Sequence, residues 1–136
     1  MSDTDQKAMF KKLARRAAQL AADKKASDIK ILDLLEKSAV AEFVVLATVE
    51  SRPQMDAVAS EISMKFKEDG YYTLHAEGRG SQQWQVLDYG GLLIHVLMAP
   101  AREFYGLDKL LHYAKSVPFV DKSVSPKSRA AAKKRA

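Results

Sequence analysis

Residues 84–98, WQVLDYGGLLIHVLM, place an aspartate and a histidine within a run of strand-forming apolar residues. These are residue types of general acid and base catalysis. Two strands joined at the Gly-Gly pair form a hairpin, because this dipeptide is favoured where both turn residues need a positive φ. The register then pairs Tyr89 with Leu92, Leu87 with Ile94, Val86 with His95 and Trp84 with Leu97. Since successive side chains alternate between faces, Trp84, Asp88 and His95 share one face and Tyr89 lies on the other.

Asp88 and His95 are diagonal neighbours in this hairpin, roughly 7 Å apart at Cα, and could form an acid–base pair. We favour the interpretation that His95 is half-buried and held by a hydrogen bond. The other histidines, His75 and His112, belong to different elements, and the chain has no G-x-S-x-G motif. Residues 28–119 contain no D-x-D pair, and the EGRGS stretch lacks the Lys-Ser/Thr of a phosphate-binding loop. We therefore predict no catalytic residue, no metal site and no cofactor.

Trp84 stands beside polar neighbours, and tryptophan is enriched at protein interfaces because it combines a flat apolar body with one donor. An ordinary sheet tryptophan covered by a helix fits the pattern equally well. Arg102, Phe104 and Tyr105 follow soon after and could line the same patch.

The elements that must position these residues begin with an amphipathic helix in residues 1–27, from Thr4 or Asp5. Its apolar side is rich in alanine, so a plain core helix and a lightly docked arm both remain open. The stripe is Phe10, Leu13, Ala17, Leu20 and Ala21.

Residues 27–35 alternate as a strand does, and the β-branched run at residues 42–49 predicts a buried central strand. A helix follows from residue 51, because Ser51 and Gln54 match a capping box, Pro53 lies in the first turn and Gly70 stops the pattern. Its apolar stripe is Met55, Val58, Ile62 and Phe66.

Residues 71–78 predict another strand before the hairpin. A last helix after Pro100 is indicated by Phe104, Leu107, Leu110, Leu111 and Ala114, and it should end before Pro118. The order implies an α/β or α+β domain at residues 28–119, with a mixed sheet of about five strands flanked by helices.

Charge is unevenly distributed. Residues 1–27 hold seven Lys/Arg against three Asp (+4), residues 121–136 hold six against one (+5), and residues 28–120 carry −4. An acidic body with basic ends fits a basic protein partner that sits beside RNA, although solubilising tails explain it equally well. We expect residues 120–136 to be a disordered basic tail. Its possible RNA contacts are Lys127, Arg129, Lys133, Lys134 and Arg135.

The chain has no cysteine, which excludes disulfides and thiolate chemistry and favours the cytoplasm. Residues 1–25 lack the apolar core of a secretory signal, and no run approaches a membrane span. A cytoplasmic protein, monomeric or weakly dimeric, is expected.

The chain resembles the ribosomal silencing factor family, also called the Iojap family, over about residues 24–117. The resemblance is carried by KKASDIKILDL, EFVVLAT, SRPQMDAVASEI, KEDGYYTLHAEG, WQVLDYGGLLIHVL and REFYGLDKLL. It implies a nucleotidyltransferase-like fold without transferase activity. It also implies binding to ribosomal protein number fourteen of the large subunit, which blocks subunit joining during starvation. The contact residues implied by position are Trp84, Asp88, Tyr89 and His95, supported by Arg102 and Tyr105.

Three positions depart from the family pattern. Gly91 stands where an acid is usual, Val49 where a glycine is usual and Leu111 where an aromatic residue is common. The alternatives are a nucleotide-dependent enzyme, a large-subunit assembly factor and a general RNA chaperone.

Overall fold

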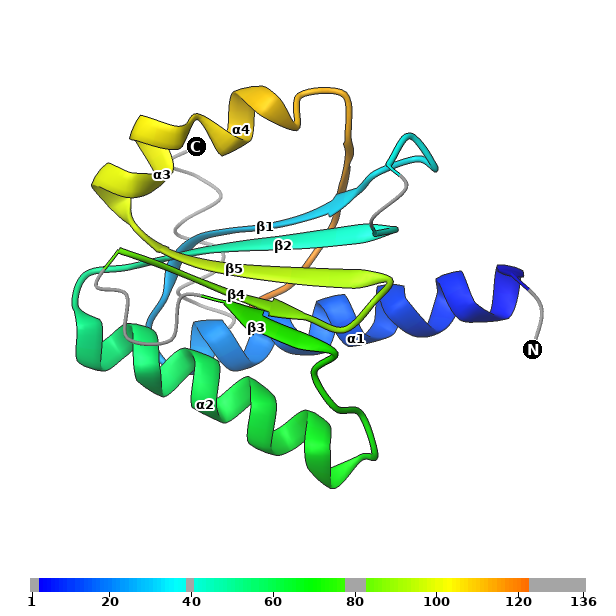
Figure 1. Ribbon diagram of the computed structural model, residues 1–136, viewed down its shortest axis with the longest axis horizontal. Coiled ribbons are helices and arrows are strands. Elements are labelled where there is room, and N and C mark those ends of the chain that lie inside the picture. The colour runs from blue at the N-terminus through cyan, green and yellow to red at the C-terminus, as the bar shows by residue number, and fades with distance from the viewer. Residues whose placement is uncertain (1–2, 39–40, 78–82, 123–136) are drawn as a thin grey trace.

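The computed structural model describes residues 3–38, 41–77 and 83–122. The elements are α1 (Asp3–Asp23), β1 (Ser27–Asp33), β2 (Phe43–Val49), α2 (Arg52–Glu68), β3 (His75–Glu77), β4 (Trp84–Asp88), β5 (Leu92–Met98), α3 (Ala99–Tyr105), α4 (Leu107–Leu110) and β6 (Lys115–Val117). Figure 1 shows a sheet between two helical layers, with α1 and α2 on one face and α3 and α4 on the other. The predicted mixed sheet flanked by helices is confirmed.

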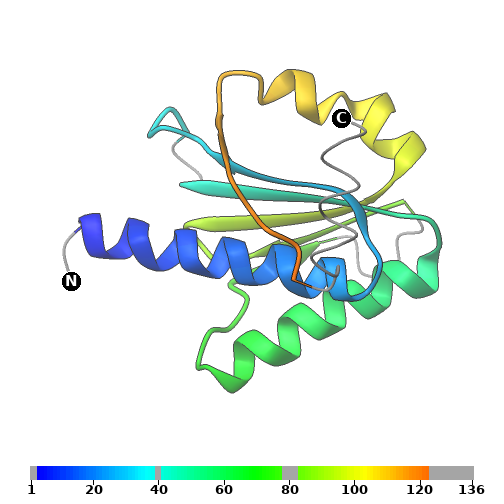
Figure 2. The same cartoon turned by 180° about the vertical axis from the view of Figure 1, so that it is seen from behind.

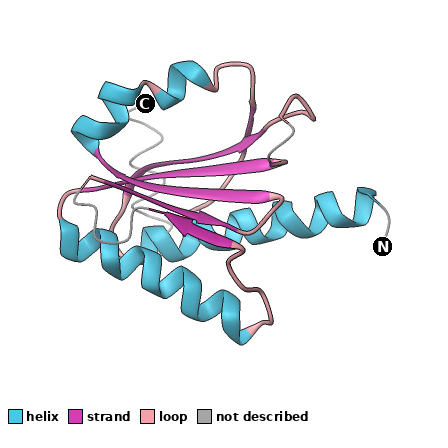
Figure 3. Ribbon diagram, in the orientation of Figure 1, coloured by secondary structure: helices cyan, strands magenta, loops and turns pink. Residues whose placement is uncertain are grey.

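The described sheet has six strands in the order β3-β4-β5-β2-β1-β6. Its one parallel pair is β2 with β5, and the other neighbours are antiparallel (Figure 3). Every residue of β2 is buried, because this strand lies inside the sheet with helices on both sides. The predicted central strand is therefore confirmed.

Ser51 caps α2 as predicted, whereas the Gln54 side chain bonds the residue before the cap instead of the cap itself. Oγ of Ser51 accepts a hydrogen bond from the Gln54 N–H at 3.2 Å, and Oε1 of Gln54 accepts one from the Glu50 N–H at 2.8 Å. Gly70, at φ +89°, follows the helix end. All four predicted stripe residues are fully buried against the sheet: Met55, Val58, Ile62 and Phe66.

The N-terminal helix α1 belongs to the main core. Five of its buried side chains share one cluster with β2, β5 and α2: Leu13, Ala14, Ala17, Ala18 and Ala21. Because an alanine side chain ends at Cβ, the stripe allows the helix backbone to lie close to the sheet. Of the two alternatives, the structure shows the core helix.

The hairpin has the predicted register, with Trp84 opposite Leu97 and its two faces divided as expected. The expectation that both turn glycines have positive φ is wrong, since only Gly90 does, at +87°. Gly91 is required for space: a Cβ at this position would lie 2.3 Å from Cδ2 of Phe10 on α1. The two glycines therefore serve different purposes.

The predicted single last helix is wrong. Gly106 adopts a left-handed conformation at φ +59°, and its N–H bonds the carbonyls of Arg102 and Glu103, which ends α3. The chain then forms the short α4 and strand β6, which pairs antiparallel with β1. This break leaves Phe104 and Leu110 exposed rather than aligned on one buried stripe.

Two predicted segments fall partly outside the described residues, namely the strand at residues 71–78, which is described to residue 77, and the tail at residues 120–136, which is described to residue 122. The tail residues Lys127, Arg129, Lys133, Lys134 and Arg135 lie outside the described residues. Of the helices that are described, none has the length and apolar character needed to cross a membrane.

Candidate functional site

Trp84 on β4 and His95 on β5 form the centre of the site. The indole Nε1–H donates a hydrogen bond to His95 Nδ1 at 3.0 Å, and the two ring centroids are 5.7 Å apart. Because Nδ1 accepts this bond, the proton of the neutral imidazole resides on Nε2. The pair therefore fixes both the indole orientation and the histidine tautomer.

Burial lowers the pKa of His95 from 6.5 to about 4. At neutral pH the imidazole is therefore uncharged, as the bond from Trp84 requires. A base with so low a pKa is poorly matched to proton transfer near pH 7. The interpretation of His95 as a half-buried residue held by a hydrogen bond is confirmed.

Asp88, at the end of β4, has a different hydrogen-bond partner from His95. Its Oδ1 accepts a hydrogen bond from the Gly90 N–H at 2.7 Å and so holds the hairpin turn. His95 is bonded to Trp84, so the two side chains direct their hydrogen bonds to different partners. Their arrangement is that of a turn and an oriented indole rather than an acid–base pair.

Two aromatic residues of α3 extend the site outward. The ring centroid of Tyr105 lies 4.8 Å from that of Trp84, and the Phe104 centroid lies 5.1 Å from that of Tyr105. The residues Trp84, His95, Phe104 and Tyr105 are called the aromatic cluster below. Phe104 is 83% exposed and Tyr105 is 53% exposed, so the cluster runs from a half-buried histidine to open solvent.

The resemblance implies that Arg102 supports the contact residues, and its hydrogen bonds show how it would do so. Its side chain is buried, with Nε and Nη2 donating to the two carboxylate oxygens of Asp108, each at 2.9 Å. Nη1 donates to Thr48 Oγ1 at 2.9 Å and to the Asp28 carbonyl at 2.5 Å. The guanidinium holds the pKa of Asp108 well below its usual value. Arg102 therefore fixes α3 and α4 to the sheet instead of facing solvent.

Tyr89 lies apart from the aromatic cluster, as the alternation of faces predicts. It lies on the opposite face of the hairpin, is buried, and packs against Phe66 with ring centroids 4.9 Å apart. Burial raises the pKa of its phenol. Of the six predicted contact residues, four share the face of the aromatic cluster or line it: Trp84, Asp88, His95 and Tyr105.

Sequence reasoning missed the exposure of Leu110, which is 66% exposed on α4, and placed Phe104 both on the stripe of the last helix and in the patch beside Trp84. Gly106 between them was the available signal, because a glycine within a helical pattern often marks a helix end.

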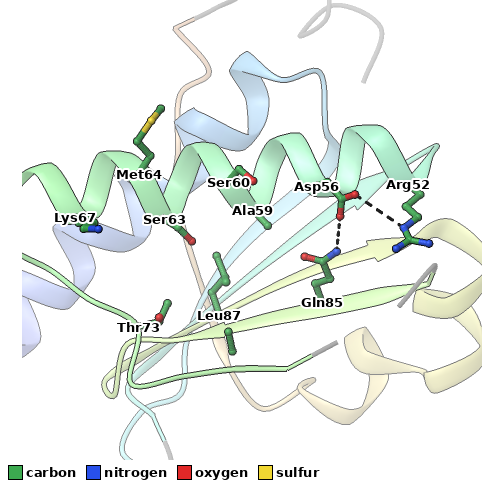
Figure 4. A pocket seen from close by; sticks show the side chains of 11 residues that line it. Arg52, Asp56, Ala59, Ser60, Ser63, Met64, Lys67, Thr73, Gln85 and Leu87 are labelled. Atoms are coloured by element: carbon green, nitrogen blue, oxygen red, sulfur yellow. Dashed lines mark hydrogen bonds and ion pairs between the residues drawn. The ribbon is translucent and has the colours of Figure 1, made fainter. Parts of the chain in front are cut away.

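A groove of about 630 Å³ lies between α2 and strands β3 and β4 (Figure 4). Gln85 donates to Asp56 Oδ1 at 2.8 Å, and Arg52 lies 3.9 Å from the same carboxylate. Gln85 and Asp56 thus bind each other across the groove, and Arg52 pairs with Asp56 along the same helix. Nowhere in the described part of the chain do three His, Cys, Asp or Glu residues gather as metal ligands.

The fold and the site define a small mixed α/β protein whose sheet carries a partly exposed aromatic cluster on the face opposite α1 and α2. The family model "Ribosomal silencing factor during starvation" matches residues 7–136. The chain belongs to the ribosomal silencing factor family, and this membership supports a role in ribosome silencing.

Individual relatives from a bacterium and from a plant chloroplast are similar to this chain in sequence. The chain is 33% identical to the ribosomal silencing factor of Bacillus subtilis over 100 residues, which cover 74% of this chain and 85% of that protein. It is 34% identical to the chloroplastic protein Iojap of Arabidopsis thaliana over 125 residues, 90% of this chain. That alignment covers 52% of the plant protein, so this chain spans about half of its length.

A solved structure of a Chromobacterium violaceum protein is similar with a TM-score of 0.73 and 26% identity, covering 88% of this chain and 98% of that one. A second, from Bacillus halodurans, has a TM-score of 0.66 and 28% identity, covering 79% and 95%. Both support the fold described above.

Proposed function

We propose that this protein binds the large ribosomal subunit through ribosomal protein number fourteen and thereby blocks joining of the small subunit during starvation. The observation that carries the proposal is the aromatic cluster, in which an oriented indole is continued by two exposed rings. Aromatic residues of this kind supply much of the binding energy at protein interfaces.

Charge supports a basic partner. Residues 28–120 carry a net charge of −4. The half-buried Asp88 lies on the Trp84 face of the hairpin, and the exposed Glu103 directly precedes Phe104. Carboxylates beside an aromatic surface favour a partner with lysines and arginines, because complementary charge accelerates association and fixes register.

Occlusion needs affinity and placement but no chemical step. A stable interface buries roughly 1,600 Å² in total, enough to cover part of a surface on which two subunits meet. The function that we propose is therefore that of a cytoplasmic binding factor without catalytic residues. In it, Asp88 holds the hairpin turn and His95 orients the indole of the binding surface.

The test is sedimentation of the purified protein with isolated large and small subunits, with subunit joining scored in the same samples. We expect binding to large subunits and inhibition of joining. Trp84→Ala should reduce both by at least tenfold while the circular dichroism spectrum is retained, because it removes the centre of the aromatic cluster.

The matched control is Tyr72→Ala, which removes an aromatic side chain that is 62% exposed and outside the aromatic cluster. It should leave binding unchanged. Full binding by the Trp84 variant, or equal loss in both variants, would contradict the assigned surface. Metal-dependent nucleotide turnover by the purified protein would instead favour the enzyme alternative.

A further inference from the structure

A second surface lies on α1, on the other side of the sheet from the aromatic cluster. The segment after β6 descends to the C-terminal half of α1 (Figure 2). Between them is a groove of about 580 Å³, lined by Arg15, Arg16, Gln19, Pro118, Phe119, Val120 and Lys122. The groove therefore joins two parts of the chain that are about a hundred residues apart.

Gln19 fastens the C-terminal segment to the helix. Its Oε1 accepts a hydrogen bond from the Lys122 N–H at 2.8 Å, and its Nε2 donates to Asp121 Oδ1 at 3.2 Å. Nε2 also donates to Asp23 Oδ1 at 2.9 Å. These bonds hold the backbone at residue 122 against α1, so the basic residues that follow in the sequence start from this point.

The groove has cationic walls. Arg15 and Lys122 are exposed on its two sides, and Lys11 and Lys12 continue the exposed charge along α1. Within the described ranges, no carboxylate forms an ion pair with these four side chains. Arg16 differs, because it is paired with Asp69. The uncompensated charge is therefore concentrated on one side of the helix.

The charge and the lining residues of the groove indicate which class of ligand would fit it. Pro118, Phe119 and Val120 supply an apolar side, and the walls supply arginine and lysine, which together suit a polyanion that also carries flat bases. Residues 123–136 cannot fill this role, because they contain five Lys/Arg and no acidic residue and would be repelled.

We propose that the groove between α1 and residues 118–122 is an RNA-binding site that contacts phosphates of ribosomal RNA while the aromatic cluster contacts the ribosomal protein. The choice of ribosomal RNA rests on the proposed function. The arrangement gives the protein two attachments on opposite faces of one sheet, and linked attachments strengthen binding beyond either alone.

The first experiment measures binding of a short fluorescent RNA stem–loop to the full chain by anisotropy at several salt concentrations. The double variant Arg15→Glu/Lys122→Glu should bind at least tenfold more weakly near 0.15 M salt. It should also lower the slope of log affinity against log salt by about two, one for each lost phosphate contact. The control is Lys37→Glu/Lys109→Glu, which makes the same charge change at exposed positions outside the groove.

Equal loss in the test and control variants would overturn the site, since it would show a response to net charge alone. Phosphatidylserine vesicles and a poly-glutamate peptide are the competing ligands. Tighter binding of either than of RNA, with the same sensitivity to the Arg15 and Lys122 changes, would overturn the choice of RNA.

Subunit sedimentation separates this inference from the proposed function. The groove variant should still pellet with large subunits at low salt but be released at a lower salt concentration than the wild type. Trp84→Ala should lose subunit binding and keep RNA binding. If the wild type fails to bind subunits, the proposed function falls; if the groove variant matches the wild type at every salt concentration, the RNA site falls.

Discussion

The indole N–H of Trp84 donates a hydrogen bond to Nδ1 of His95 across the hairpin at 3.0 Å. Tryptophan occurs once in this chain, and a neutral imidazole sets the direction of its ring. The ring centroid of Trp84 also lies 4.8 Å from that of Tyr105, so by orienting the indole His95 influences the exposed part of the aromatic cluster. A preoriented anchor loses less side-chain entropy on binding.

Trp84→Phe keeps an aromatic ring and removes the donor to His95. We expect the free energy of unfolding to fall by about 1–2 kcal/mol, because a largely buried acceptor loses its hydrogen bond. Large-subunit binding should weaken less than in Trp84→Ala, since most of the apolar surface remains. Urea unfolding and sedimentation measure the two effects; an unchanged unfolding free energy would show that the bond contributes nothing.

The stability of the protein should depend on pH through His95. Its pKa is about 4 in the folded protein and about 6.5 when exposed, so between these values the unfolded state binds more protons. Stability is therefore complete above about pH 6.5 and declines as the pH falls toward 4, by up to about 3 kcal/mol. Urea unfolding at half-unit pH intervals checks this slope.

His95→Asn provides the control, because the amide oxygen can accept the indole hydrogen bond and does not titrate in this range. Its unfolding free energy should be nearly flat between pH 6.5 and 4. Asp108 loses its contribution only below the ordinary carboxyl range, since its pKa is lowered on folding. A slope in the asparagine variant equal to that of the wild type would assign the effect to another group.

Local sequence patterns were sufficient to predict the hairpin and α2. Alternation between faces and the Gly-Gly turn fix the hairpin register, and a one-residue shift would expose buried residues such as Ile94. In α2 the cap residues lie within three positions of one another. Each of these signals is contained in a short stretch of sequence, so each was predictable.

Features that depend on distant residues were not predictable. The partners of Arg102 include Thr48 and the Asp28 carbonyl, 54 and 74 positions earlier, so its sequence neighbourhood gave no sign of burial. Strand β6 has three residues and one buried side chain, Val117, and it exists because β1 offers a free edge for pairing. Both features follow from the assembled sheet.

Arg102→Leu should destabilise the protein by about 3 kcal/mol, because it removes the bidentate pair with Asp108 and the bond to Thr48 together. It should also weaken subunit binding, since α3 carries Phe104 and Tyr105. Thermal unfolding and sedimentation measure these losses.

Lys30→Ala is the matched control for the same carboxylate. Lys30 bonds Asp108 Oδ1 at 2.8 Å but is exposed, so its removal should cost less than about 1 kcal/mol. Similar losses in the two variants would mean that the buried guanidinium has no special role in fixing α3.

Gly91→Ala should destabilise the protein by about 1–3 kcal/mol through a clash with α1 rather than through the turn. Gly91 does not have positive φ, but its added Cβ would lie 2.3 Å from Cδ2 of Phe10. Phe10→Ala should relieve the clash, so the double variant should be more stable than the sum of the single changes predicts.

Comparison with Gly90→Ala distinguishes backbone strain at the turn from the clash with Phe10. Gly90 has φ +87°, and its added Cβ would meet only Leu74 Cδ1 at 3.3 Å, so the cost is conformational and should not change when Phe10 is truncated. Chemical denaturation of both double-mutant cycles gives the coupling energies. Coupling to Phe10 at residue 91 but not at residue 90 would show that the glycine standing where the family usually has an acid makes room for the N-terminal helix. The absence of coupling at residue 91 would contradict it.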